Sequence, residues 1–324
     1  MPLGEFELIE RYFRAAGASR DDVVAGIGDD AALLAPAPGM QLVAAIDTLV
    51  DGVHFPTGSP ASSVGHRALA VNLSDLAAMG ANPAWALLAL TVPSGDEAWL
   101  AEFARGFGAL ARMHGVALVG GDTTRGPLCA SVQLLGHVPR GAAMLRSGGS
   151  AGDVLCVTGT PGDAAGGLAL EQARAASSSD EDARYLRERF LYPQPRCAIG
   201  VRLREFASAC IDVSDGLAAD AGKLAAASGC GVRIEIEELP LSTHLTRAFG
   251  VSRARDLALS GGDDYELLFT IGVDRIAALA RELPPEDSGW RRIGELCEKP
   301  GVYLAQSGAV TQFSPSGYDH FAGG

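Results

Sequence analysis

The chain has 324 residues, of which 48% are apolar and 20% charged, and its 39 acidic against 26 basic residues give a formal charge of −13. This length predicts about two domains, and the acidity argues against a nucleic-acid partner, whose phosphates demand basic patches. Acidity does not exclude a phosphorylated ligand, because bound metal changes the local sign of the charge.

The first half of the chain predicts several strands and two long helices. Hydrophobic spacing indicates a short amphipathic helix over residues 5–16. An apolar strand over 41–46 is expected to end at Asp47, and helical spacing over 62–79 places Asp75 in mid-helix. The other expected elements are strands at 85–92, 116–119 and 130–138 and a helix at 97–114. This half is therefore α+β in character.

A segment rich in Gly, Ser and Arg at residues 139–152 predicts a domain boundary. We therefore expect an N-terminal domain over residues 1–139 and a C-terminal domain over 150–324. The elements expected after the boundary are strands at 153–158, 209–213, 232–236, 266–271 and 301–305, a helix at 164–176 and a helix starting near residue 214. The whole chain is predicted to be a two-domain α/β protein.

Six cysteines are scattered along the chain without a C-x-x-C pair. Most have apolar neighbours, which favours buried free thiols in a reducing cytosol over a disulfide framework or a zinc site. The N-terminus lacks a basic region followed by an apolar run, so no signal peptide is expected. No apolar stretch approaches about 18 uninterrupted residues, so we expect no membrane span and a cytoplasmic location.

Short acidic segments on Gly-, Ser- or Thr-rich turns recur beside apolar segments. They are Gly26–Asp30, Asp47–Asp51, Asn72–Asp75, Gly120–Thr124, Asp212–Gly216 and Gly261–Glu266. Carboxylates beside buried strands are costly unless they are paired or bound to a metal. Oxygen-only ligands suit Mg²⁺, which commonly bridges a few carboxylates to substrate phosphates. The pattern predicts a Mg²⁺-dependent enzyme that handles phosphate groups.

Each acidic segment also has a simpler structural explanation. Gly26–Asp30 could be a surface turn or a helix cap, and Ser214 could cap the helix that follows it. Asp47 could make a structural hydrogen bond, and Asp75 could lie on a solvated helix face. Asp122 follows two glycines, which permit close approach of the backbone to a phosphate. The joint occurrence of the segments therefore carries more weight than any one of them.

The sequence lacks the common nucleotide-binding signatures, including G-x-x-x-x-G-K-[ST] and a G-x-G-x-x-G after a strand. An ATP site would therefore use a different scaffold. Arg146 could clamp an ATP phosphate bidentately, His54 could touch substrate, and Tyr318 could stack on an aromatic substrate. The three could equally be a solvated arginine, an incidental loop histidine and a residue that plugs the end of a core.

Taken together, the acidic segments resemble the thiamine-monophosphate kinase family over nearly the whole chain and in the right order. The segments that match are Gly28–Ala32, Asp47–Val50, His54–Phe55, Asn72–Ala81, Gly120–Thr123, Arg189–Arg196, Asp212–Leu217 and Gly261–Leu267. Individual turns are shared with aminoimidazole ribonucleotide synthetase, selenide water dikinase and a hydrogenase-maturation dehydratase. The combination of Asp47–Phe55 with Gly262–Glu266 is rather specific to the thiamine enzyme.

The resemblance implies an aminoimidazole ribonucleotide synthetase-like fold, with an N-terminal sheet that pairs with its copy in a homodimer and a C-terminal α/β domain that covers the nucleotide. It implies transfer of the γ-phosphate of ATP to thiamine monophosphate, the step that yields thiamine diphosphate. By position, several Mg²⁺ ions would be held by Asp30, Asp47, Asp75, Asp122, Asp212 and Asp215, of which Asp30, Asp75, Asp122 and Asp212 would serve catalysis. The ATP site would use Gly121, Asp122, Arg146 and Ser214, and thiamine monophosphate would meet His54, Asp263 and Tyr318.

One departure from the family concerns the residues before Asp47. The family commonly has Ser or Thr there, whereas this chain has Ala45 and Ile46, so one side-chain ligand is missing. Two other functions are compatible with the same motifs: a related ATP-using ligase or dikinase with another substrate, and a non-catalytic Mg²⁺–nucleotide sensor. A selenide-dependent member would carry a reactive Cys or Sec near its N-terminus, and the first cysteine here is Cys129.

Overall fold

A computed structural model describes residues 4–173, 181–315 and 317. The chain divides into two compact units: an N-terminal unit of the residues up to Leu76 with Ala81–Gly141, and a C-terminal unit of Ala77–Gly80 with the residues from Ala142 onward. Both units combine helices with a sheet, as an α/β class predicts. Among the described residues, no helix has the length and apolar character needed to cross a membrane.

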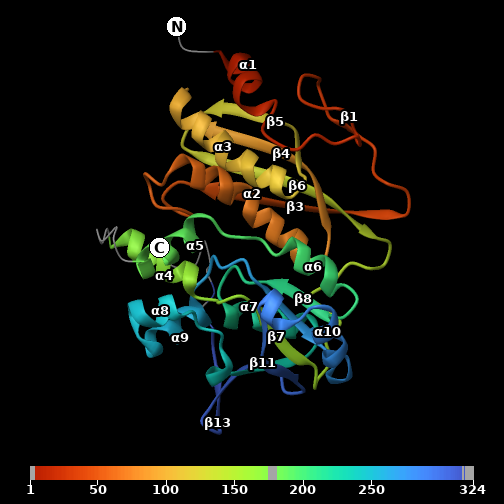
Figure 1. The fold of residues 1–324 in the computed structure, drawn as a ribbon, viewed down its shortest axis with the longest axis vertical. Helices are drawn as coiled ribbons and strands as arrows, with labels where there is room; N and C mark the ends of the chain where they lie inside the picture. The colour runs from red at the N-terminus through yellow and green to blue at the C-terminus, as the bar shows by residue number, and fades with distance from the viewer. Residues whose placement is uncertain (1–3, 174–180, 316, 318–324) are drawn as a thin grey trace. The chain divides into compact units, whose positions relative to one another are not determined.

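The N-terminal unit is built on a four-stranded sheet with two long helices on one face (Figure 1). The strands, in sheet order, are β3 (Met40–Val50), β6 (Cys129–Pro139), β4 (Asn82–Val92) and β5 (Ala117–Arg125), and the helices are α2 (Ala61–Ala78) and α3 (Glu97–Met113). β4 and β5 pair in parallel, and the other neighbours are antiparallel. Side chains alternate in period two, so that Leu88, Val132 and Leu134 are buried on one face of the sheet.

Two glycines let α2 and α3 cross in backbone contact. A Cβ on Gly65 of α2 would lie 2.1 Å from the carbonyl oxygen of Phe103, and one on Gly106 of α3 would lie 1.9 Å from that of Ser62. Real Cβ atoms do not approach oxygen so closely, so any side chain at these positions would push the helices apart. The crossing therefore fixes the separation between α2 and α3.

The other face of the four-stranded sheet is covered only in part. A small hairpin of β1 (Val23–Ala25) and β2 (Leu33–Leu34) packs near Trp85 on the β4 side. Along β3 the same face stays open, with Leu42 and Ile46 exposed by 52% and 66%. The segment before the hairpin holds α1 (Glu5–Leu8) and a short π-helical turn, η1 (Ile9–Phe13), so the single helix expected over 5–16 is wrong.

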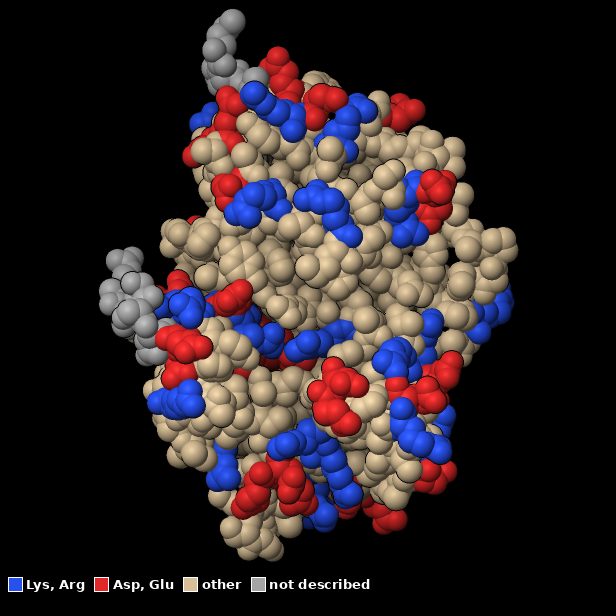
Figure 2. Space-filling model, in the orientation of Figure 1, with Lys and Arg blue, Asp and Glu red and all other residues tan. Residues whose placement is uncertain are grey.

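The C-terminal unit contains a mixed seven-stranded sheet in the order β13-β12-β9-β11-β7-β10-β8. Its strands are β7 (Val154–Thr158), β8 (Ala209–Asp212), β9 (Gly231–Glu235), β10 (Leu267–Ile271), β11 (Trp290–Cys297), β12 (Val302–Gln306) and β13 (Ala309–Phe313). Its longer helices are α4 (Asp163–Gln172), α5 (Glu181–Leu191), α7 (Leu217–Ala227) and α9 (Val251–Ser260). Shorter helices are α6 (Cys197–Leu203), η2 (Ile236–Glu238), α8 (Thr243–Phe249), η3 (Val273–Arg275), α10 (Ile276–Glu282) and α11 (Pro285–Ser288). On the face drawn in Figure 2, basic and acidic side chains lie interspersed on this unit.

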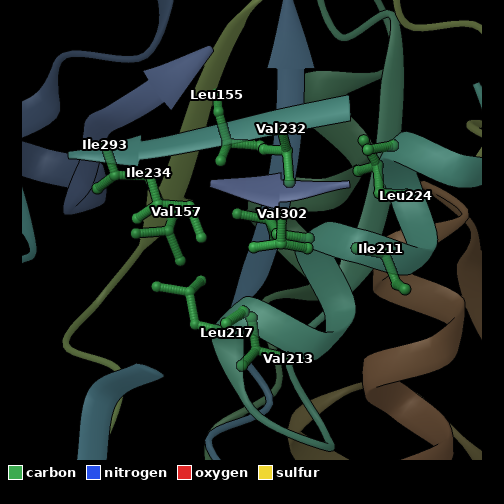
Figure 3. Packing of buried hydrophobic residues seen from close by; sticks show 14 of the residues in the cluster. Leu155, Val157, Ile211, Val213, Leu217, Leu224, Val232, Ile234, Ile293 and Val302 are labelled. Carbon is green, nitrogen blue, oxygen red and sulfur yellow. The ribbon is translucent and has the colours of Figure 1, made fainter. Parts of the chain in front are cut away.

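The core of the C-terminal unit lies between this sheet and α7. Aliphatic side chains from six strands, including Leu155, Ile211 and Val232, form one buried cluster with Leu217 and Leu224 of the helix (Figure 3). All five of these residues are at most 2% exposed. Burying a side chain of this size contributes about 1.5–3 kcal/mol, so the packing holds β8 and the start of α7 firmly. The turn between those two elements carries an acidic segment.

Three sequence expectations about the acidic segments are wrong in detail. Asp47 does not end its strand, because β3 continues to Val50. Gly120–Thr124 lies within β5 rather than in a turn. Ser214 is not the N-cap of the following helix, because α7 begins at Leu217 and Gly216, with φ of 108°, is its N-cap without a side-chain hydrogen bond.

Candidate active site

Two of the predicted aspartates meet in the N-terminal unit. Asp47 lies on β3, two residues before the buried Leu49, and Asp75 lies in the last turn of α2 rather than in mid-helix; both are half-buried. Their carboxyl groups share a hydrogen bond. Burial raises the pKa of Asp47, while the bond with Asp75 and the neighbouring His54 lower it. Two carboxyl groups that share a bond need a proton or a cation between them, and Mg²⁺ with phosphate oxygens suits such a pair.

His54 lies just beyond β3, in the loop that returns toward α2. The backbone amide of Val50 donates a 3.0 Å hydrogen bond to its Nδ1, so that nitrogen is the acceptor and Nε2 carries the proton. The side chain of Arg67, only 1% exposed, donates to the His54 carbonyl oxygen at 3.4 Å. The ring is thereby held close enough to Asp47 to affect its pKa.

Asp122 lies on the opposite edge of the same sheet. The strand register aligns it with Ala89, then Ser131, then Thr48, the residue after Asp47. Three strand spacings of about 4.8 Å place β5 about 14 Å from β3. Asp122 is exposed and does not join the Asp47–Asp75 pair within one chain. The backbone of Gly121 there has φ of 150°, and a Cβ would meet the Leu88 carbonyl oxygen at 1.9 Å, so only glycine fits.

Asp30 lies at the exposed connection between β1 and β2. Its backbone amide donates a hydrogen bond to Oδ1 of Asp29 at 2.9 Å, as in a tight turn. Gly28 has φ of 118°, and a Cβ there would approach the Arg14 guanidinium at 3.0 Å. Within the described residues, no three or more His, Cys, Asp or Glu side chains gather into a metal-binding group.

In the C-terminal unit, Asp212 ends β8 and the turn of Ser214 and Asp215 follows. Asp220 of α7, 1% exposed, organises this turn: its Oδ2 accepts the amides of Ser214 and Asp215, each at 2.9 Å. Burial raises the pKa of Asp220, and the bond from Lys223 works against that shift. Asp220 and Lys223 were not among the residues predicted from the sequence, although an acid and a lysine three residues apart in a helix are a recognisable pair.

Lys223 also connects the turn to its own helix. Its ammonium donates to Oδ1 of Asp220 at 2.8 Å and contacts the carboxylate of Asp215. The Asp215 carboxylate is therefore already partly neutralised by this side chain. A metal ion at Asp215 would share the carboxylate with Lys223 or displace the ammonium.

The segment Gly261–Glu266 lies beside this turn. The amide of Asp263 donates to the carbonyl oxygen of Ser214 at 3.0 Å, and that of Tyr265 to Val213 at 2.9 Å. The predicted nucleotide residue Ser214 and the predicted substrate residue Asp263 are thus brought together. Arg146 is exposed, and its carbonyl oxygen accepts a 3.0 Å hydrogen bond from Ser228. Tyr318 lies outside the described residues.

Comparisons with known proteins identify the family of the chain. Two models of the AIR synthase related family match the chain, the N-terminal domain at residues 28–138 and the C-terminal domain at 150–306. The thiamine-monophosphate kinase of Escherichia coli K12 is 46% identical over 323 residues, which is 99% of each chain.

Solved structures give the same result. The crystal structure of the thiamine-monophosphate kinase from Stenotrophomonas maltophilia K279a matches with a TM-score of 0.87 and 49% identity, over 95% of this chain and 99% of that one. A ThiL protein complexed with AMPPCP and TMP matches with a TM-score of 0.79 and 31% identity, over 88% and 89% of the two chains. The chain therefore belongs to the AIR synthase related family and, within it, to the thiamine-monophosphate kinases.

Proposed function

We propose that this protein phosphorylates thiamine monophosphate with ATP, the reaction that yields thiamine diphosphate in its biosynthesis. The observation that carries the proposal is the full-length match to thiamine-monophosphate kinases, and the fold also matches a ThiL protein complexed with AMPPCP and TMP. The ATP side would use Gly121, Asp122, Arg146 and Ser214. The acceptor side would use His54, Asp263 and Tyr318.

Magnesium is the metal that these residues fit. The hydrogen-bonded Asp47–Asp75 pair and the raised pKa of Asp47 are what a hard cation would relieve. Asp30, Asp122, Asp212 and Asp215 would hold further ions, and within one chain an ion at Asp122 would differ from the ion that Asp47 and Asp75 share. When bound, Mg²⁺ would reduce the electrostatic repulsion between the two negatively charged phosphate groups.

The chain's own contribution to the reaction would be positioning. The acceptor is a phosphate oxygen that is already ionised near neutrality, so no strong general base is required. Asp220 holds the Ser214 turn through two backbone amides, and the Val50 amide holds the His54 ring. Fixed groups of this kind favour in-line attack, which is the main demand of phosphoryl transfer.

If the acceptor is a phosphate group, thiamine monophosphate should be a much better substrate than thiamine. With ATP and Mg²⁺, thiamine monophosphate should yield thiamine diphosphate, and thiamine should be a poor substrate because its hydroxyl would need a base. Chromatography of the products with both substrates in parallel measures this. Efficient phosphorylation of thiamine would overturn the mechanism, and nucleotide binding without any product would favour the sensor.

We also propose that the protein is a homodimer that pairs through the open face of the N-terminal sheet. Leu42 and Ile46 expose apolar side chains on the part of that face that the β1–β2 hairpin leaves uncovered. Apolar patches of this kind mark association surfaces. A second copy would cover the patch with an identical one, as a twofold interface requires.

Ile46→Asp should disrupt this dimer. An unpaired buried polar group costs about 1–3 kcal/mol and an unpaired charge more. The twofold interface contains the substituted residue twice, so the dimer dissociation constant should rise roughly 30-fold or more. Sedimentation velocity over a dilution series measures the shift. Val273→Asp is the matched control, because Val273 in the C-terminal unit is also 66% exposed. An Ile46→Asp protein that sediments like the unmodified chain would remove this face as the interface.

The charge and the cysteines of the chain bear on its other partners and its location in the cell. We propose small-molecule substrates rather than nucleic acid, supported by the net charge of −13 and the interspersed charges in Figure 2. The six free cysteines support a reducing compartment such as the cytoplasm.

A further inference from the structure

The Gly261–Glu266 loop is held in place by two buried acidic side chains. The first is Asp264, which is 2% exposed. Its carboxylate accepts the amides of Gly162 at 2.7 Å and Ala164 at 3.1 Å, at the N-terminus of α4. A carboxylate that takes two amides at a helix N-terminus is strongly oriented. The loop is therefore tied to the start of α4.

The second is Glu266, the last residue of the loop, which is fully buried. It accepts the hydroxyl of Thr158 at 2.6 Å and guanidinium hydrogen bonds from Arg189 at 2.8 Å and from Arg196 at 2.6 and 2.7 Å. Burial would raise the pKa of Glu266, but the two arginines outweigh burial and hold it below its ordinary value. Glu266 is therefore a fixed anion between two cations.

The residues next to Asp264 and Glu266 have strained backbones. Asp263 has φ of 68° and Tyr265 has φ of 51°. Among the described non-glycine residues, only Ser307, in the turn between β12 and β13, shares the left-handed region. Such backbones persist only where the surroundings enforce them, and they cluster at functional sites. Here the two strained backbones are enforced by Asp264 and Glu266 and by the hydrogen bonds from the Asp263 and Tyr265 amides to the carbonyl oxygens of Ser214 and Val213.

The strained backbone brings two side chains together. The Tyr265 hydroxyl donates a 2.8 Å hydrogen bond to Oδ1 of Asp263. The Tyr265 side chain is only 7% exposed, so its ring is packed and its hydroxyl is a fixed donor. A fixed donor two residues away sets the direction of the Asp263 carboxylate, because an unconstrained aspartate rotates about two bonds.

We propose that Tyr265 is a positioning residue that orients the Asp263 carboxylate toward the cationic organic part of the acceptor substrate, in a loop that Asp264 and Glu266 hold in place. This inference rests on the proposed function for the identity of the acceptor. A thiazolium cation is a suitable ligand for an oriented carboxylate, whereas the phosphate groups of either substrate are not. Tyr265 should therefore affect acceptor binding and leave ATP binding alone.

Tyr265→Phe tests this, because it removes the hydroxyl and keeps the packed ring. The KM for thiamine monophosphate should rise roughly 2- to 10-fold, the factor that matches the usual net contribution of one hydrogen bond. The KM for ATP, kcat and the melting temperature should stay close to their original values. Tyr303→Phe is the matched control, because Tyr303 is 9% exposed in the same unit and donates to the Pro300 carbonyl oxygen at 3.0 Å.

A double-mutant cycle with Asp263→Asn then asks whether Tyr265 acts through Asp263. Adding Tyr265→Phe to Asp263→Asn should change the KM for thiamine monophosphate no further. Additive effects, an equal rise in both KM values, or no rise at all with Tyr265→Phe would each overturn the proposal.

Calorimetric titration of thiamine monophosphate separates this inference from the proposed function. If the unmodified protein binds thiamine monophosphate but forms no product, the proposed kinase activity fails. The positioning role still stands in that case if Tyr265→Phe weakens binding and falls if it does not. If the unmodified protein neither binds nor converts thiamine monophosphate, both proposals fall.

Discussion

Asp75→Asn is expected to lower kcat by about 30- to 1,000-fold while the protein stays folded. Two unit charges about 4 Å apart, as on the donor and acceptor phosphates, repel by about 4 kcal/mol at an effective dielectric near 20. Bound Mg²⁺ would offset this repulsion, and losing half to all of that offset raises the activation barrier enough to give this range. Asparagine has the shape of aspartate and can donate to Asp47, with which Asp75 shares a hydrogen bond. The melting temperature should therefore be unchanged or higher.

Steady-state assays at millimolar Mg²⁺, with a thermal melt of each preparation, measure both quantities. Asp21→Asn is the control, because Asp21 is an exposed carboxylate of the same unit outside the acidic segments. Near-original activity of Asp75→Asn would exclude Asp75 from the metal site. Loss of activity together with a large fall in melting temperature would make Asp75 a structural residue.

Glu266→Gln should destabilise the C-terminal unit by about 3–5 kcal/mol, because it leaves Arg189 and Arg196 without their buried anion. For a unit of this size, about 2–4 °C per kcal/mol corresponds to a fall of about 6–20 °C in melting temperature. The folded-state pKa of Glu266 is lowered, so its contribution is present above its ordinary value of 4.5 and is lost as pH falls through the lowered pKa. The deficit of the variant should therefore be large at neutral pH and shrink in acid.

Thermal melts of both proteins from neutral pH down to acid pH check the prediction. Glu235→Gln is the matched control, because its pair with Arg233 at 3.0 Å is exposed by more than a third on both sides, and such pairs contribute about 0–1 kcal/mol. Equal effects of the two substitutions would mean that burial adds nothing to the Glu266 cluster.

Local patterns predicted much of the fold but placed several acidic residues in the wrong local structure. Apolar spacing gave α2 to within one residue at each end, because a long helix repeats its signal over several turns. The extension of β3 to Val50 was missed because Asp47 reads as a strand end. Its partner strand β6 continues to pair there, and long-range pairing of that kind leaves no mark in the local sequence.

The residues that hold the candidate site in place were the hardest to predict. Asp220 accepts amides of the turn just before its own helix, and Asp264 accepts an amide about a hundred residues earlier in the chain. In the sequence such residues look like ordinary helix or loop acids, since only the folded chain shows which amides they face. Motifs therefore predicted the candidate ligands, and the structure was needed to find what positions them.

The crossing of α2 and α3 has a consequence for how this protein can change over evolutionary time. Gly65 and Gly106 bring the two helices into main-chain contact, with no side chain setting their separation. Substitutions among the aliphatic residues around them alter the packing but cannot easily change the spacing that backbone atoms define. The helix that carries Asp75 can therefore keep its place while its surroundings drift, and the two glycines are the positions at which drift would be costly.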